Sequence, residues 1–330
     1  MKLKKITLVF IILDIIIIMI LGLMLGPLKS KIINNNLSKH VLVNTLYKEN
    51  DVLKGLAKKT SIKIKNKIDY EPKLVEINSS KFNEYETQVL TPDEGNAEYK
   101  LINLKVGGYD SFLVVIYNPS KVHIVTKEVL GTEYGESLIK MCNRYNASVC
   151  INGGEFVDYG YGSGIPGGYV IEGGKIRWPQ TPTDRRSNLI AITKDSKLKL
   201  LTNVTGEEAI EQGVMDALEF GPFLIVDGKV QDVGHYSVGG YLGAARVAIA
   251  QRRDGIMLFL VTNGVHGRGS TMAELIETLV NYGAYNAANL DGGASSSLVI
   301  NGKLTNTPRN IYGEVVVGGR TVVDGFGLLR

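Results

Sequence analysis

Residues 288–297 read Ala288-Asn289-Leu290-Asp291-Gly292-Gly293-Ala294-Ser295-Ser296-Ser297: a short apolar run, then a carboxylate, two glycines and three hydroxyls. Because glycine has no Cβ, backbone N–H groups beside Asp291 can approach a ligand closely, and consecutive amides in a turn form an anion-binding concavity. The same pattern suits a tight turn whose aspartate caps its own backbone. A second turn of this kind, Ile151-Asn152-Gly153-Gly154-Glu155-Phe156, favours a functional site.

Both glycine-rich turns follow short β-rich runs, which predict strands at 147–151 and 285–290. Helical spacing predicts helices at 133–145 and 271–282, and in the second of these Thr271 and Glu274 form a capping box. Further strands are predicted at 101–106, 112–117, 122–126, 169–172, 188–193, 223–226, 245–250 and 256–262, the first three as a meander. We therefore expect an α+β fold with a mixed β-sheet and flanking helices, forming a single globular domain over residues 81–330.

Composition excludes some classes of partner. The chain has 330 residues, of which 44% are hydrophobic and 21% charged, as in a globular protein with a sizeable core. With 37 basic and 33 acidic residues, the charge is too balanced for a nucleic-acid partner. Cys142 and Cys150 lack the spacing of metal ligands; they are either two buried thiols or, in an extracellular domain, a disulfide.

The N-terminus has the pattern of a membrane anchor. Lysines at positions 2, 4 and 5 precede the run Ile6 to Leu25, which only Asp14 interrupts and which is long enough to cross a bilayer as a helix. No small-x-small cleavage site follows the run, and the preceding lysines keep that end in the cytoplasm. We expect a cytoplasmic tip and transmembrane signal anchor at 1–27 and a helical, lysine-rich stalk at 28–80. The protein would then be a single-pass cell-membrane protein with an extracytoplasmic globular domain.

Polar candidates lie at the ends of predicted strands. Asn152, Asn263 and Asp291 each follow such a strand, and ligand sites form where strand ends converge. The segment 264–271 has the glycine spacing of a phosphate loop but no lysine, so nucleotide hydrolysis is not expected. Its helix N-terminus would still favour an anion, with His266 and Arg268 adding positive charge. The alternative is a flexible loop that only caps the helix.

Two arginines stand in unusual settings. Arg246 opens an apolar run of small residues, where an unpaired guanidinium would be costly to bury. A bound phosphate or carboxylate would satisfy it, and so would a structural ion pair with Asp291 or Glu155. Arg320, in the run Gly-Gly-Arg-Thr-Val, raises the same question.

Together these segments resemble the phosphodiester glycosidase family over roughly residues 100–330. The resemblance rests on Asn152-Gly153-Gly154-x-Phe156, Gly221-Pro222-Phe223-Leu224 with Asp227-Gly228, Arg246-Val247-Ala248-Ile249, Met272-Ala273-Glu274-Leu275, Asn289-Leu290-Asp291-Gly292-Gly293-Ala294-Ser295-Ser296 and Arg320-x-Val322-x-Asp324. The chain departs from the family's pattern at three places. Glu155 stands where a second aromatic is common, Asn263-Gly264-Val265 where Asp-Gly-Arg is common, and Ala294 where a third glycine is usual.

The resemblance implies an extracytoplasmic hydrolase that cleaves sugar-1-phosphodiesters, such as N-acetylglucosamine-1-phosphodiesters, in cell-envelope or exopolysaccharide glycans. We assign Asp291 as nucleophile or base, Glu155 as a candidate second carboxylate, Arg246 as the phosphate clamp and Asn152 as a group that orients the phosphate. Substrate-binding residues are expected at Gly153, Gly154, Asn263, His266, Arg268, Gly292, Gly293, Ser295, Ser296 and Arg320. No cofactor is expected, and whether a divalent cation binds stays open. The alternative is a non-catalytic surface protein that holds anionic glycans in the same pocket.

Overall fold

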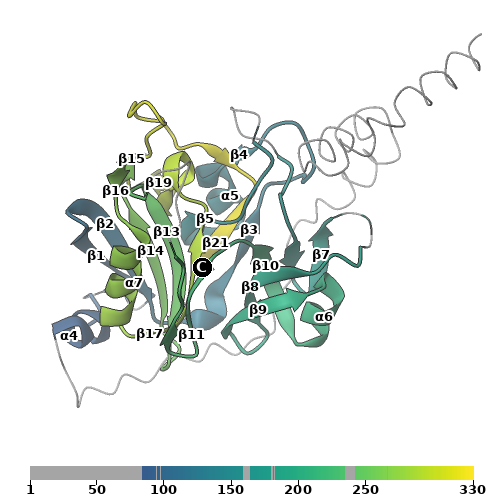
Figure 1. The fold of residues 1–330 in the computed structure, drawn as a ribbon, viewed down its shortest axis with the longest axis horizontal. Coiled ribbons are helices and arrows are strands. Elements are labelled where there is room, and N and C mark those ends of the chain that lie inside the picture. Colours follow the sequence, from purple (N-terminus) through teal and green to yellow (C-terminus); the bar gives the residue numbers. More distant parts are fainter. Residues whose placement is uncertain are drawn as a thin grey trace, which may run out of the picture. The chain divides into compact units, whose positions relative to one another are not determined.

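Three large β-sheets make up most of the structure, a computed structural model that describes residues 84–330 except 94, 97, 159–163, 180, 182, 235–241 and 266 (Figure 1). The described residues all belong to one compact unit. The predicted anchor at 1–27 and the predicted stalk at 28–80 both lie outside the described residues. Among the helices of the described part, none has the length and apolar character needed to span a bilayer.

The largest sheet has seven strands in the order β1-β2-β14-β13-β17-β11-β12. Its strands are β1 (Tyr99–Val106), β2 (Tyr109–Ile116), β11 (Phe223–Val226), β12 (Lys229–Val230), β13 (Arg246–Arg252), β14 (Met257–Thr262) and β17 (Ala284–Leu290). Helix α7 (Met272–Asn281) connects the β14 side of this sheet to β17, which inserts between β13 and β11.

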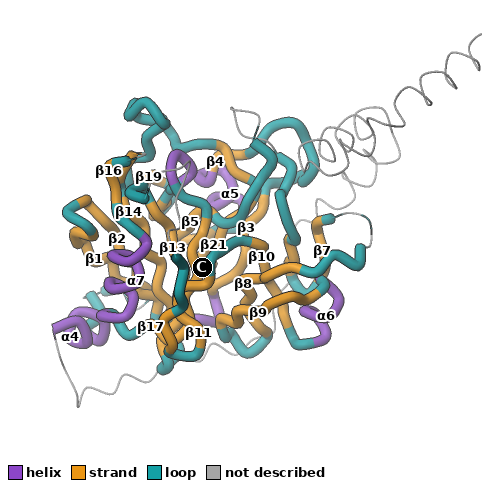
Figure 2. Tube along the Cα trace, in the orientation of Figure 1, coloured by secondary structure: helices purple, strands orange, loops and turns teal. Residues whose placement is uncertain are grey.

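Two five-stranded sheets complete the framework, in the orders β19-β18-β5-β21-β3 and β7-β6-β10-β8-β9. The first contains β3 (Val122–Thr126), β5 (Ala147–Asn152), β18 (Leu298–Ile300), β19 (Lys303–Leu304) and β21 (Asp324–Leu329). The second contains β6 (Val170–Glu172), β7 (Lys175–Trp178), β8 (Ser187–Thr193), β9 (Leu198–Val204) and β10 (Val214–Glu219). The short pairs are β15 (Gly264–Val265) with β16 (Arg268–Gly269) and β4 (Glu136–Ser137) with β20 (Thr321–Val322). The remaining helices are α4 (Glu84–Leu90), α5 (Leu138–Arg144), α6 (Gly206–Glu211), η1 (Pro119–Lys121) and η2 (Gly293–Ser295). Figure 2 shows how sparse the helices are beside the strands.

The main core lies between the seven-stranded sheet and the β19-β18-β5-β21-β3 sheet. Val247 and Ile249 of β13 belong to the same buried cluster as Ile151 of β5 and Phe326 of β21. Successive side chains of a strand point to opposite faces, so the alternate residues of β13 and β14 pack with α7 in a second cluster. Because both faces are covered, β14 is buried along its whole length.

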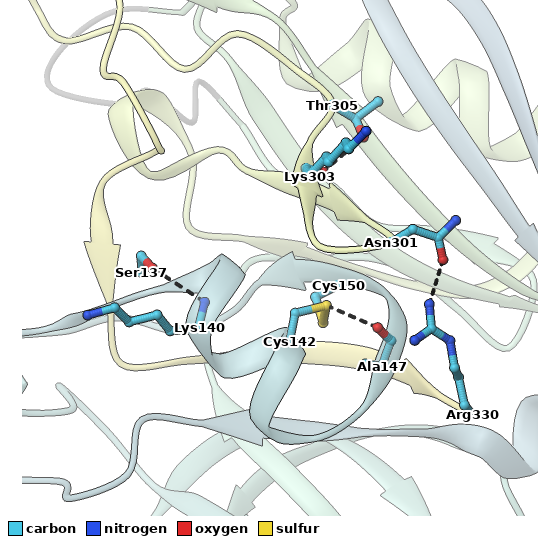
Figure 3. Close-up of a disulfide and its surroundings, with 9 residues drawn as sticks. All are labelled: Ser137, Lys140, Cys142, Ala147, Cys150, Asn301, Lys303, Thr305 and Arg330. Atoms are coloured by element: carbon cyan, nitrogen blue, oxygen red, sulfur yellow. Dashed lines mark hydrogen bonds between the residues drawn. A yellow bond between two sulfur atoms is a disulfide. The ribbon is translucent and has the colours of Figure 1, made fainter.

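A disulfide between Cys142 and Cys150 joins α5 to β5, with the two Cα atoms 6.0 Å apart (Figure 3). The sequence left open whether these cysteines are bridged, and the structure decides for the bridge. The strand held in this way ends at Asn152.

The sequence located most of these elements but misjudged how the strands pair. Every pairing among the described strands is antiparallel, so the predicted mixed sheet is wrong, and the domain is mostly β with few helices. The predicted meander of three strands is also wrong, because β3 pairs with β21 from the other end of the chain. Helix α5 begins at Leu138 rather than at 133, because the two residues before it form strand β4. The predicted capping box of α7 is confirmed: Thr271 and Glu274 exchange side-chain and backbone hydrogen bonds.

Candidate active site at converging strand ends

Four strands bring distant segments together at one end of the two packed sheets (Figure 1). Strand β5 ends at Asn152 and β17 ends one residue before Asp291, whereas β13 begins at Arg246 and β21 begins at Asp324. Because neighbouring strands run antiparallel, the end of one lies beside the start of the next. The segments that the sequence singled out thus share one end of the fold.

Asn152 fixes the loop that carries Asp291. Its fully buried side chain donates from Nδ2 to the carbonyl oxygen of Asp291 (2.7 Å) and accepts at Oδ1 from the amide of Ser297 (2.9 Å). The amide of Asp291 donates to the carbonyl oxygen of Gly153 (2.9 Å). Both polar atoms of Asn152 are therefore engaged with backbone groups. These bonds give Asn152 a structural part in holding the Asp291 loop, and its expected part in orienting the phosphate stays a prediction.

The glycines serve close packing. The amide of Gly153 donates to the carbonyl oxygen of Asp324 (3.0 Å), that of Gly154 to Oδ1 of Asp324 (2.6 Å), and that of Gly293 to the carbonyl oxygen of Ala245 (2.9 Å). A Cβ at position 153 would lie 2.4 Å from Oδ1 of Asp324, so only glycine fits there. These three amides are already paired within the protein. The anion cradle predicted for them is thus replaced by a structural role.

The remaining residues of the Asp291 loop are also tightly held. A Cβ at Gly292 would lie 2.8 Å from the carbonyl oxygen of Ala245. The buried hydroxyl of Ser295 hydrogen-bonds the side chain of Asp291. The hydroxyl of Ser296 is buried without a hydrogen-bond partner among the described residues. Of the predicted substrate-binding residues in this loop, Ser295 is thus the one that contacts the candidate carboxylate.

Asp291 combines partial exposure with a raised pKa. Part of its surface remains accessible, but dense packing removes water from the carboxyl group and raises its pKa from 3.8 to about 6. The hydrogen bond from Ser295 and the charge of Arg320 lower this pKa, whereas the charges of Glu155 and Asp158 raise it. An accessible carboxylate with a pKa near 6 can act as a nucleophile or base at neutral pH.

Among the cations in the described part of the chain, Arg320 is the one whose charge lowers the pKa of Asp291. Its Nη2 donates to Oδ1 of Asp158 (2.5 Å), and its guanidinium carbon lies 5.1 Å from the centre of the Phe156 ring. Because the side chain of Arg320 remains partly exposed, it can exchange the Asp158 carboxylate for another anion. Glu155, the second carboxylate proposed from the sequence, is exposed, and its charge raises the pKa of Asp291.

Asp324 is a second carboxyl group that the sequence analysis did not assign to the site. It is 2% exposed, and burial together with the charge of Asp291 raises its pKa to about 7. Its position was signalled by the segment Arg320-x-Val322-x-Asp324, which we used for the resemblance without giving the aspartate a role. The sequence analysis also gave Phe156 and Asp158 no part in the site. Their contacts are with Arg320, and the sequence does not show which residues lie beside that arginine. In the described part of the chain, no group of three or more His, Cys, Asp and Glu side chains is arranged to hold a metal ion.

Arg246 is fully buried at the start of β13. Its Nε donates to the carbonyl oxygen of Ser270 (3.2 Å) and its Nη2 to that of Leu242 (2.6 Å). These bonds tie β13 to the segments on either side of it. Full burial and bonds to backbone oxygens make Arg246 a structural anchor more than the exposed phosphate clamp that we expected.

In the 263–271 segment, strand β15 contacts η2, the short helix that follows Asp291. Asn263 accepts a hydrogen bond at Oδ1 from the amide of Thr307 (3.0 Å), and Arg268 is exposed on β16. The amide of Thr271 donates to Glu274 (2.8 Å), which completes the cap of α7 from within. This internal cap weakens the prediction of an anion at the helix N-terminus. His266 lies outside the described residues.

Comparisons with known proteins place this geometry in a family. The phosphodiester glycosidase family model matches residues 145–329, more than half of the chain. The SPbeta prophage-derived uncharacterized protein YomE of Bacillus subtilis (strain 168) is 24% identical over 203 residues, which are 60% of this chain and 31% of YomE. Human N-acetylglucosamine-1-phosphodiester alpha-N-acetylglucosaminidase is 36% identical over 81 residues, 24% of this chain and 16% of the human protein. The matches thus span less than a third of either relative.

Solved structures share the fold. The catalytic domain of zebrafish N-acetylglucosamine-1-phosphodiester alpha-N-acetylglucosaminidase, auto-inhibited by its pro-peptide, superposes with a TM-score of 0.59 at 18% identity, covering 79% of this chain and 88% of that domain. A hypothetical protein from Synechocystis gives a TM-score of 0.53 at 16% identity, covering 69% and 61%. The family model includes Asn152, Asp291 and Asp324 within its match. The chain belongs to the phosphodiester glycosidase family.

Proposed function

We propose that this chain is an extracytoplasmic, membrane-anchored hydrolase that cleaves sugar-1-phosphodiesters in cell-envelope or exopolysaccharide glycans. The observation that carries the proposal is Asp291, a partly exposed carboxylate with a pKa near 6, held on a loop that Asn152 fixes at both ends. Family membership supports the reaction class, and the names of the human and zebrafish relatives suggest N-acetylglucosamine-1-phosphodiesters as first substrates.

The reaction breaks the bond between the anomeric carbon and the phosphate oxygen. The bonding electrons leave with the phosphate, the hydroxyl of water joins the anomeric carbon, and the remaining proton of water passes to the phosphomonoester or to solvent as the sugar is released. The transition state resembles an oxocarbenium ion, so a nearby carboxylate stabilises it. Asp291 supplies this carboxylate, as nucleophile or as the base that activates water. Phosphate is a good leaving group, so the reaction needs little help from a general acid.

Arg320 is the better candidate for holding the phosphate. Its guanidinium is partly exposed, rests on Phe156 and influences Asp291, whereas Arg246 is buried against backbone carbonyl oxygens. A bidentate bond from arginine to phosphate oxygens would replace the bond to Asp158. Asp324, buried behind the Gly153–Gly154 turn, keeps its proton up to a pH of about 7 and limits the negative charge next to Asp291.

The surroundings of Asp291 favour hydrolysis over the alternative of passive anionic-glycan binding. Three further carboxyl groups, those of Glu155, Asp158 and Asp324, interact electrostatically with Asp291. A site built only to retain polyanions would be expected to gather cations. A carboxylate-rich site instead suits a reaction in which positive charge develops on the substrate.

The extracytoplasmic location draws support from the disulfide. Cys142 and Cys150 form a bridge, and such bridges persist mainly in oxidising compartments. The apolar run Ile6 to Leu25 after three lysines supports a membrane anchor from sequence.

The test is hydrolysis of defined substrates by the full chain. Methyl phosphodiesters of N-acetylglucosamine, glucose and galactose 1-phosphates are incubated with the protein, and the reducing sugar and phosphomonoester are measured together. Asp291→Asn should lower kcat by roughly 10³-fold, since it removes the charged group that acts at the anomeric carbon. Asp184→Asn, at an exposed position, is the matched control. Full activity of Asp291→Asn with an unchanged fold would refute the assignment.

A further inference from the structure

Exposed apolar side chains gather at the end of the fold that carries Asp291. The large hydrophobic residues that remain exposed in the described part are eight. Six of them belong to loops around the candidate site, and we call these six the apolar rim: Tyr134, Leu242, Ile311, Tyr312, Val315 and Val317. The other two, Val230 on β12 and Val280 near the end of α7, lie elsewhere.

Contacts place the rim beside the site. Tyr134 lies in a loop whose neighbour Thr132 pairs with Gly164, next to the Phe156–Pro166 bridge. Leu242 accepts a hydrogen bond from Arg246 at its carbonyl oxygen (2.6 Å). The other four residues belong to the segment 305–320 between β19 and β20, visible in Figure 1 as the yellow loop that projects beyond β15, β16 and β19.

The base of this projecting segment touches the Asp291 loop. Arg320, whose charge lowers the pKa of Asp291, is the last residue of the segment. A Cβ at Gly319 would lie 3.0 Å from the hydroxyl oxygen of Ser297, and the amide of Thr307 donates to Asn263. The segment therefore projects from the edge of the candidate site, with its base at the Asp291 loop.

The tip is ordered by its own hydrogen bonds, although its side chains face water. Arg309 and Val315 form a β-bridge, and Oδ1 of Asn310 accepts hydrogen bonds from the amides of Tyr312 and Glu314 (both 3.0 Å). The turn between them places Ile311 (58% exposed) and Tyr312 (81% exposed) where polar turn residues are usual. Val317 is 93% exposed. A fixed turn that exposes aliphatic and aromatic side chains indicates a surface built to be covered.

The charge and the size of the tip indicate which kind of partner covers it. The tip carries one cation, Arg309, and one anion, Glu314, so it is electrically neutral and does not suit a polyanionic glycan. A stable protein interface takes roughly 20–30 residues a side, far more than this short tip offers. Tyrosine is enriched at the boundary between lipid headgroups and acyl chains, and large aliphatic side chains on a narrow projection can bury their apolar surface there.

We propose that the apolar rim, led by Ile311 and Tyr312, inserts into a lipid surface and that the substrate is a sugar-1-phosphodiester whose alcohol partner carries a long alkyl or prenyl chain. This inference rests on the proposed function and names its substrate class. The lipid chain stays in the bilayer, the phosphate lies against Arg320, and the anomeric carbon reaches Asp291. Hydrolysis leaves the phosphomonoester in the membrane and releases the sugar to water.

The direct test needs no turnover. The full chain with Tyr312→Trp is reconstituted with vesicles of zwitterionic lipid, with and without brominated acyl chains, and tryptophan emission is recorded. We expect a blue shift and quenching by brominated lipid. Val230→Trp should show neither, and Trp178 is a background common to both variants. The absence of quenching in Tyr312→Trp, equal quenching in the two variants, or a blue shift that follows protein concentration without lipid would each overturn the proposal, the last in favour of a second copy.

The kinetic test separates this inference from the proposed function. For Ile311→Ser/Tyr312→Ser, kcat/KM should fall at least about tenfold on a long-chain alkyl phosphodiester presented in vesicles, because each lost side chain removes apolar burial worth about that factor. On the methyl phosphodiester it should stay within about twofold, and Val230→Ser/Val280→Ser should match the unmodified chain on both. Equal losses on both substrates, or no loss on the vesicle substrate, would refute the lipid contact. Quenching at position 312 without turnover of any sugar-1-phosphodiester would refute the proposed function alone.

Discussion

The buried carboxyl of Asp324 should make the stability of this domain depend on pH. The side chain is 2% exposed, and Oδ1 accepts a hydrogen bond from the amide of Gly154 (2.6 Å). Burial is the main cause that raises its pKa from 3.8 to about 7, and the charge of Asp291 adds to it. The perturbation that isolates this effect is Asp324→Asn, since an asparagine oxygen can still accept from Gly154 but never carries a charge.

The sign follows from proton binding. Between pH 4 and 7 the folded state holds a proton on Asp324 that the unfolded state has released, so the free energy of unfolding falls as pH rises through this range. A pKa change from 3.8 to about 7 corresponds to about 4 kcal/mol at 1.36 kcal/mol for each tenfold change in proton affinity. Local relaxation around the charge reduces this cost, and we expect about 2–4 kcal/mol at pH 8.

The assay is unfolding of the full chain by heat or denaturant at pH 4.5, 6 and 8, followed by circular dichroism. Asp324→Asn should be as stable as the unmodified chain or slightly less stable at pH 4.5, and clearly more stable at pH 8. Asp184→Asn, at an exposed position, controls for the general change in charge. A stability difference that stays constant from pH 4.5 to pH 8 would show that Asp324 does not hold a proton in the folded protein, and the argument from burial would fail.

Three further outcomes are expected. On methyl phosphodiesters, kcat/KM should rise as pH rises through about 6, because Asp291 must lose its proton to act; a rate that is flat from pH 5 to 7 contradicts this role. Gly153→Ala should lower the free energy of unfolding by about 1–3 kcal/mol, because its Cβ would lie 2.4 Å from Asp324; denaturant unfolding measures this, and an unchanged midpoint contradicts the packing. Cys142→Ser/Cys150→Ser removes a bridge with a sequence separation of 8 and should lower the free energy of unfolding by about 2–3 kcal/mol relative to the oxidised chain. An unchanged free energy of unfolding would show that the cysteines are reduced in the native protein.

Local pattern was enough to find many elements of this fold. The capping box at Thr271 and Glu274 marks the start of α7, and the apolar run before Asp291 is strand β17. Pairing was beyond the sequence because it depends on residues far apart along the chain. Strand β3 lies beside β21, about 200 residues later, and no local signal in either strand names its partner.

In the candidate site too, local pattern could propose residues, but their contacts depend on distant parts of the chain. Asp291 could be proposed from the sequence because a carboxylate before two glycines is a local pattern, and its catalytic role stays a prediction. Asn152 could be proposed too, but its bonds to the backbone could not be foreseen, since an amide beside glycines suggests a ligand contact as readily as a bond to backbone. Arg246 was overvalued because its isolation in an apolar run showed that it needs a partner, without showing that backbone carbonyl oxygens could serve.

Asp324 shows why the two carboxyl groups must be considered together. The charge of Asp291 raises the pKa of Asp324 because the start of β21 lies near the end of β17, and the Gly153–Gly154 turn, whose amides bond Asp324, holds that arrangement. When Asp291 is ionised, its charge favours the protonated form of Asp324, so a pH between about 6 and 7 leaves one charge on the pair. The glycines thus contribute to the chemistry indirectly: they let a buried acid approach closely enough to keep the exposed carboxylate the one that is charged.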